Sequence, residues 1–238
     1  MTRSPHPEQA PAVQKLRIRF AKRDRLRFTS HRDFQRAFER ALRRARVPVA
    51  YSQGFTPHPK VSYAGAAPTG AASEAEYLEI SVTEVCDPAT VAKVLDDALP
   101  AGLDLVAVVE AEGESLADRL QASEWEIMLP DADRAVLAAA AAAFLAAPRV
   151  EVQRMTKKGL RTLDARDAVV RLTVRDDTPA LRAVVRHQTP TVRPDDVLAA
   201  LQQLADLPLG QHLATRRAQG PLDAAAGTVS DPLAAGQR

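Results

Sequence analysis

The sequence predicts an α+β fold, built from two tandem ferredoxin-like (split βαβ) halves with disordered N- and C-terminal tails. Hydrophobic periods of two and of 3.6 residues alternate in the order strand, helix, strand, strand, helix, strand, which is the ferredoxin-like unit, and the order recurs after residue 113. A length of 238 residues suits one large domain or two small ones. We expect halves at 13–112 and 113–210 between tails at 1–12 and 211–238, because the ends lack large apolar residues.

The first strand is predicted from an alternation of apolar and cationic residues. Leu16, Ile18 and Phe20 alternate with Arg17 and Arg19, so one face of the strand is apolar and the other cationic. After a turn at 23–24 the alternation resumes at 26–28.

A helix follows, with Ser30 as its N-cap and an end near Pro48. Its apolar stripe comprises Phe34, Ala37, Phe38, Ala41, Leu42 and Ala45, and its other face carries Arg32, Arg36, Arg40, Arg43 and Arg44. Like charges four residues apart oppose each other by a few tenths of a kcal/mol per pair. The helix therefore needs compensating packing or a bound anion.

The rest of the first half supplies the remaining elements of the unit. Residues 49–52 and 61–63 are expected to be extended, with an irregular connection at Pro57-His58-Pro59, and 77–82 forms a strand. Asp87 caps a helix that ends near residue 99, and a strand spans 103–109.

The second half begins after an acidic connection at 110–124. Its predicted elements are a strand at 125–129, an alanine-rich helix capped by Asp131, strands or hairpin arms at 150–155, 160–163, 168–174 and 180–186, and a helix at 194–204. One strand more than the unit requires is present.

Charge is strongly segregated along the chain, although the formal net charge is only +2. Residues 14–63 contain 14 Lys and Arg against three acids, 74–133 contain two against 16 acids, and 149–193 contain 11 against five. The basic segments could attract a polyanion. The alternative is that basic and acidic segments neutralise each other in the folded chain.

Ser30 and His31 lie where a strand turns into the helix, which suits a phosphate, because free N–H groups and the positive end of the helix dipole meet there. His31 could act as a general acid or base on a ribose hydroxyl, hydrogen-bond an anion, or merely support the turn. His58, held between two prolines, is either a loop residue or a ligand contact.

Two further segments are candidates for nucleic-acid contact. Gln53-Gly54-Phe55, followed by Lys60, places an aromatic ring beside a flexible glycine, so Phe55 either stacks on an unpaired base or belongs to the core. Lys157 and Lys158 form a basic hairpin tip that either contacts a phosphate backbone or is an ordinary solvated turn.

Several classes are excluded or disfavoured. The lone Cys86 excludes an intramolecular disulfide and an iron–sulfur cluster held by this chain alone, and no metal site is predicted. No apolar run is long enough to span a membrane, and no export signal is evident, so a cytoplasmic protein is expected. The sequence has no glycine-rich phosphate loop and no nucleophile elbow.

The run from residue 15 to 82 resembles the radical-SAM-linked domain of unknown function, a bacterial family found beside or fused to radical SAM proteins. The resemblance rests on 27–31, 40–44, 51–60 and 73–77, with 157–159 and Asp164 similar to its second signature. Arg32 departs from the leucine usual there. The resemblance implies a radical SAM protein as partner, which would carry the iron–sulfur cluster and S-adenosylmethionine, with no cofactor on this chain.

The leading hypothesis is a non-catalytic accessory that presents a structured RNA, such as transfer or ribosomal RNA, to that enzyme. RNA is favoured because tandem ferredoxin-like halves with a basic face are similar, by fold analogy, to CRISPR repeat-processing endoribonucleases. Arg36, Arg40, Arg43 and Arg44 would grip phosphates, Phe55 would stack, and His31 with His58 would line the site where the halves meet. The alternatives are a metal-independent endoribonuclease with His31 as base, and a protein-only scaffold that docks on a partner enzyme.

Overall fold

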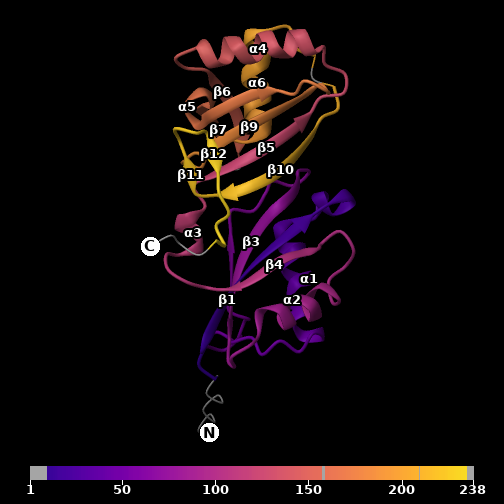
Figure 1. Cartoon of the computed structure of the whole chain (residues 1–238), viewed down its shortest axis with the longest axis vertical. Coiled ribbons are helices and arrows are strands. Elements are labelled where there is room, and N and C mark those ends of the chain that lie inside the picture. Colours follow the sequence, from indigo (N-terminus) through magenta and orange to yellow (C-terminus); the bar gives the residue numbers. More distant parts are fainter. Residues whose placement is uncertain (1–9, 157–158, 209, 235–238) are drawn as a thin grey trace.

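The computed structural model describes residues 10–156, 159–208 and 210–234 and shows two α+β halves stacked end to end (Figure 1). The first half contains β1 (Gln14–Lys22), η1 (Asp24–Phe28), α1 (His31–Arg44), β2 (Val61–Ala64), β3 (Ala72–Val82), α2 (Pro88–Asp96) and β4 (Leu105–Glu110). Its strands lie in the order β4-β1-β3-β2, all antiparallel. This topology is consistent with the predicted ferredoxin-like unit.

The two helices of the first half cover one face of its sheet. Leu16, Ile18 and Phe20 of β1 are buried with Phe38 of α1 and Leu95 of α2 in one core cluster. The predicted apolar stripe therefore faces the sheet. One local difference is that 24–28 forms a 3₁₀ turn instead of resuming the strand, because Asp24 has a positive φ of 48°.

The second half contains a short α3 (Leu116–Arg119) in the acidic connection, followed by a second set of strands and helices. These are β5 (Ala122–Met128), α4 (Arg134–Ala146), β6 (Glu151–Thr156), β7 (Gly159–Asp164), α5 (Ala165–Ala168), β8 (Val169–Val174), β9 (Ala180–Arg186), α6 (Pro194–Leu204), β10 (Leu213–Gly220), β11 (Leu222–Asp223) and β12 (Thr228–Val229). The cap of α4 is Asp133, not Asp131, and accepts hydrogen bonds from the N–H groups of Ala135 and Val136.

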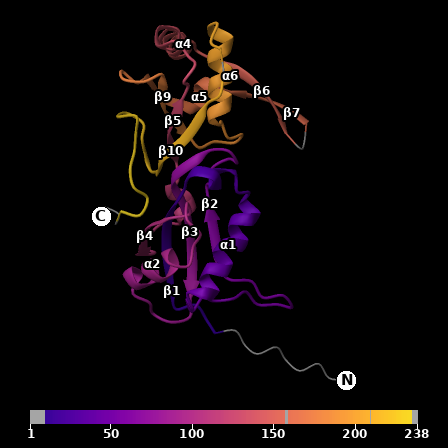
Figure 2. The same cartoon turned by 90° about the vertical axis from the view of Figure 1, so that its right-hand side faces the viewer.

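The extra strand is explained by an inserted hairpin. β6 and β7 pair only with each other and project from the body of the second half (Figure 2). Without them, the order β10-β5-β9-β8 has the same pattern as in the first half. The core lies between this sheet and α4 and α6, with Ile127, Phe144 and Leu201 fully buried.

The prediction that 211–238 is a tail is wrong for the described part of this segment. β10 pairs antiparallel with β5, and its residues Thr215 and Arg216 pair in parallel with Ala72 and Ser73 of β3. β10 thus completes the second unit and joins the halves into one eight-stranded sheet. Its sequence, LATRRAQG, lacks an apolar stripe because polar network side chains occupy its buried positions.

We predict that a chain ending at residue 210 loses more than about 5 kcal/mol of unfolding free energy, as much as the whole stability of a marginal domain. The physical reason is that β3 and β5 both lose their hydrogen-bonded neighbour β10. Urea unfolding followed by circular dichroism measures the change, with a chain ending at residue 230 as the control that retains β10 to β12. An unchanged midpoint for the shorter chain would restore the tail interpretation.

Candidate nucleic-acid interface

α1 is held in place by its cap and its buried stripe. The Ser30 hydroxyl oxygen accepts a hydrogen bond from the Asp33 N–H at 3.2 Å, and the hydroxyl donates to the Asp33 carboxylate at 2.7 Å. Phe34, Phe38, Ala41 and Leu42 are buried. This packing fixes which side of the helix faces solvent.

The solvent side of α1 is an open cationic surface, here called the arginine face. None of its members lies within 4.0 Å of a carboxylate of the described residues, and Arg44 donates only to the Ala98 carbonyl, at 3.4 Å. All five side chains are exposed. The arginine face consists of Arg32, Arg36, Arg40, Arg43 and Arg44.

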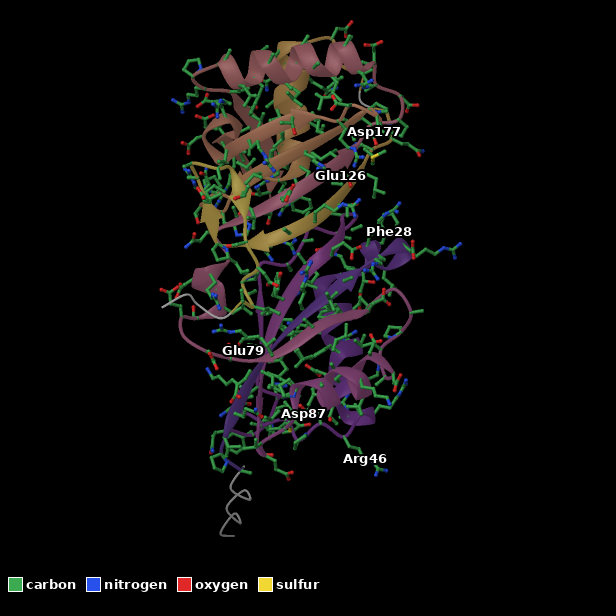
Figure 3. The ribbon with its side chains drawn as sticks, in the orientation of Figure 1. Phe28, Arg46, Glu79, Asp87, Glu126 and Asp177 are labelled. Carbon is green, nitrogen blue, oxygen red and sulfur yellow. The ribbon has the colours of Figure 1, made fainter. Side chains whose placement is uncertain are left out.

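Carboxylates of the acidic segment pair instead with cationic side chains on or beside strands. In the first half Glu79 contacts Lys15 and Arg17, each at 3.3 Å. In the second half Glu126 binds Arg175, at 2.7 Å, and Arg217. Figure 3 labels Glu79 and Glu126, one in each half. The alternative that basic and acidic segments neutralise each other therefore holds in part, but none of these ion pairs reaches the helix arginines within the described chain.

The line along which β10 pairs with the start of β3, at Ala72 and Ser73, is here called the seam between the halves. His31 lies at the first turn of α1, next to this seam. Its Nε2 is 3.1 Å from Nε2 of Gln35, and its ring meets the Tyr63 ring edge-on with centroids 5.1 Å apart. No carboxylate of the described residues hydrogen-bonds His31. The geometry therefore gives a candidate anion contact rather than a base oriented by an acid.

The 51–60 loop lies at the end of β3 opposite the seam. Tyr51 pairs with Pro59, and Val61 pairs with Ile80 at the end of β3 away from the seam. Ile80 is seven residues along the extended strand from Ser73, which lies at the seam. The distance between these two positions is therefore roughly 23 Å. His58 thus does not line the site where the halves meet, contrary to the prediction.

Several side chains of the 51–60 loop are exposed to solvent. Phe55 is 81% exposed, so the alternative that it belongs to the core is wrong. Gln53 and Lys60 are exposed as well. The His58 N–H donates to the Ser52 hydroxyl at 3.0 Å, which closes the loop on itself.

The β6–β7 hairpin forms as expected, but Lys157 and Lys158 lie outside the described residues. The hairpin and α1 project toward the same side of the molecule (Figure 2). Arg154, midway along the hairpin, is bound by the largely buried Asp196 of α6. This contact anchors the hairpin to the second half.

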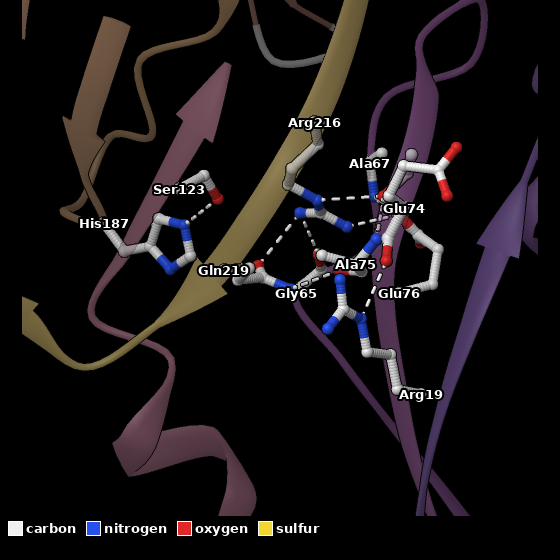
Figure 4. Close-up of polar contacts among 11 residues, drawn as sticks. Arg19, Gly65, Ala67, Glu74, Ala75, Glu76, Ser123, His187, Arg216 and Gln219 are labelled. Carbon is white, nitrogen blue, oxygen red and sulfur yellow. Dashed lines mark hydrogen bonds and ion pairs between the residues drawn. The ribbon is translucent and has the colours of Figure 1, made fainter. Parts of the chain in front are cut away.

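Sequence reasoning missed a buried polar network at the seam (Figure 4). Arg216 of β10 forms an ion pair with Glu76 of β3, and the two side chains are 3% and 6% exposed. Arg216 also donates to the Gly65 carbonyl at 2.6 Å and to Gln219 at 2.9 Å. The role of Arg216 could not be predicted, because its segment was interpreted as a tail. The acid at position 76, in an otherwise apolar strand, was a signal that could have indicated a buried ion pair.

Two cavities flank this network. One, of about 30 Å³, is lined by Lys22, Thr29, His31, Tyr63 and Glu76 together with small and aromatic residues. The other, of about 300 Å³, includes His187, whose Nε2 lies 2.7 Å from the Ser123 hydroxyl. Burial lowers the pKa of the His187 imidazole.

Burial also shapes the charges of the network. Burial alone would raise the pKa of the Glu76 carboxyl, but Arg216, Ser73, Lys22 and the Ala67 N–H together hold it below its usual value. Burial lowers the pKa of the Lys22 ammonium, with Glu76 opposing that shift and Arg216 adding to it.

Neither a metal cluster nor a membrane span is found. No three His, Cys, Asp or Glu side chains of the described residues are grouped to hold a metal ion. No helix in the described ranges is long and apolar enough to cross a membrane.

The fold and surface define a class: an α+β protein of two similar units with an open run of arginines on its first long helix. Residues 15–194 match the model of a family described as an uncharacterized protein conserved in bacteria (DUF2344). The chain belongs to this family. No curated protein matches it.

We predict that Glu76→Gln costs about 3–5 kcal/mol of unfolding free energy, because it leaves Arg216 buried without its counter-charge. The matched control is Glu151→Gln, which breaks an exposed pair with Arg149 and should cost at most about 1 kcal/mol. Urea unfolding at pH 7 measures both. Equal effects would show that the buried pair has no special role.

The ion pair also predicts a pH dependence. The pKa of Glu76 is lower in the folded than in the unfolded chain, so its stabilisation is fully present above the unfolded value near 4.5 and is lost as the pH falls through the lower folded pKa. Glu76→Gln should therefore lose less stability than the wild type between pH 5 and about pH 2. Parallel pH profiles for the two proteins would contradict the assignment.

Proposed function

We propose that this protein is an RNA-binding accessory of a radical SAM enzyme, acting in RNA modification or processing. The observation that carries the RNA part is the arginine face of α1, whose guanidinium groups make no ion pair with the described residues. Repulsion along this face is unrelieved in the free protein. A polyanion that spans several arginines relieves it and releases counterions.

Additional contacts extend this surface. The exposed Phe55 ring offers a stacking platform for an unpaired base, and His31 and Lys60 add donors near the two ends of α1. The solvent-exposed backbone groups at the capped N-terminus of α1 favour a phosphate at Ser30. RNA is favoured over a small anion because several cationic side chains follow one helix.

The radical SAM partner is supported by the sequence motifs at 27–31, 40–44 and 51–60. The iron–sulfur cluster and S-adenosylmethionine would be bound by that partner, since this chain has a single cysteine. Co-purification of the enzyme with this protein, with and without nuclease treatment, tests the partnership. Capture of the enzyme after nuclease treatment, together with no affinity for RNA, would instead indicate a protein-only scaffold.

We predict that affinity for a structured RNA falls with salt, with a slope of log affinity against log salt of about 0.7–0.9 per phosphate neutralised. The double variant Arg36→Gln/Arg40→Gln should lower this slope by about 0.7–0.9 for each arginine removed. It should fold normally, because both side chains are exposed.

Arg134→Gln is the matched control, since Arg134 is an exposed arginine at the start of α4, at the far end of the molecule (Figure 1). Fluorescence anisotropy between 50 and about 300 mM salt measures all three proteins. A wild-type affinity that does not change with salt would exclude RNA binding by this surface, as would an equal slope for the double variant.

A further inference from the structure

The small cavity at the start of α1 contains an unpartnered buried cation. Lys22 is only 5% exposed and lines the cavity, and its ammonium group has no hydrogen bond or ion pair within 4.0 Å in the described chain. Lys22 follows Phe20 by two residues, across an irregularity in the pairing of β1 with β3, and its side chain lies near Glu76. Burying an unpaired ammonium is costly, so its presence points to a ligand.

Other donors line the same cavity. The Tyr63 hydroxyl is buried and has no hydrogen-bond partner in the described chain. Thr29 supplies a second hydroxyl, and His31 supplies an imidazole at the start of a 14-residue helix. Together these four donor-bearing side chains could hydrogen-bond several oxygens of one anion, as a phosphate group offers.

Four charged groups lie at or beside the cavity. Glu76 also lines the cavity, but its charge is engaged by Arg216 in the buried ion pair. Glu76, Arg216 and Lys22 together carry a formal charge of +1. Glu39 on α1 is close enough to raise the pKa of Tyr63, after burial, so its negative charge opposes this excess.

The size of the cavity limits what can enter. Its volume of about 30 Å³ is an order of magnitude below the roughly 300 Å³ at which small-molecule sites begin. Of its lining residues only His31 and Ala66 are exposed, so it opens between α1 and the segment before β3. A group that reaches Lys22 must therefore be the end of a ligand, because a phosphodiester would need room for chain on both sides.

We propose that this cavity binds a phosphate monoester, supplied by the terminal phosphate of the RNA that the arginine face holds. The RNA source rests on the proposed function, whereas the anion site itself rests on Lys22, Tyr63, Thr29 and His31. Arg32 and Arg36 begin the arginine face, one and five residues after His31, which lines the cavity. A bound RNA end would thus lie in line with the arginines of α1.

The test compares one RNA sequence with a 5′-phosphate, a 3′-phosphate or hydroxyls at both ends. The wild type should bind one phosphorylated form about tenfold or more tightly than the hydroxyl form, the effect of a charge-assisted hydrogen bond. Lys22→Met should abolish the preference but leave affinity for the hydroxyl form unchanged. Lys93→Met, which removes an exposed lysine of α2, is the matched control and should keep the preference.

Folding is checked separately. Lys22→Met removes an unpartnered buried charge, so its melting temperature should equal or exceed that of the wild type. A merely structural lysine would give a lower one. Tyr63→Phe retains the ring contacts with His31 and Phe34 and should reduce the preference for phosphate by a smaller factor.

A second arm uses inorganic phosphate alone, titrated by ³¹P nuclear magnetic resonance. Line broadening with the wild type and Lys93→Met, but not with Lys22→Met, supports the anion site. If the proteins show this broadening but bind no RNA, the anion site stands and only the proposed function fails. Equal affinity of the wild type for all three RNAs overturns the terminal-phosphate proposal while leaving RNA binding intact. Phosphate broadening that is the same in Lys22→Met overturns the site.

Discussion

The buried ion pair between Arg216 and Glu76 is the contact on which the joined structure depends. A buried guanidinium and carboxylate are costly to desolvate, so this pair stabilises the fold only while both members and their hydrogen bonds stay together. That requirement fixes β10 against the start of β3 with little tolerance for a shift in register. The seam therefore specifies how the two units meet, although each unit has its own hydrophobic core.

The same seam connects the fold to its candidate function. The segment from Gly65 to Ala67 is held by hydrogen bonds to Arg216 and Glu76, and it forms one wall of the cavity at the start of α1. The helix N-terminus with His31 forms the opposite wall. A ligand group in this cavity would thus contact α1 and the segment that both strands of the seam hold, which makes the join between the units a natural place for recognition.

Two kinds of arginine in this chain have different roles because of their positions. Arg17 on β1 is buried and bound by Glu79 and by carbonyl groups of the 110–115 segment, so it belongs to the structure. The arginines of α1 alternate with a buried stripe and so point outward, away from the acidic strands. The near-zero net charge of the sequence conceals this division. Only the exposed group is available to a polyanion.

The sequence by itself determined the elements of the first unit, most of those of the second, and the outward direction of the helix arginines, since hydrophobic period and capping residues act within a few neighbouring residues. Ser30 and the stripe through Phe34 and Phe38 were sufficient for α1. The role of β10, the separation of His58 from His31, and the unpartnered state of Lys22 were decided only by the tertiary structure. Each depends on residues distant in sequence: β10 is polar because its partners lie on β3, and Lys22 is buried because segments from several elements enclose it.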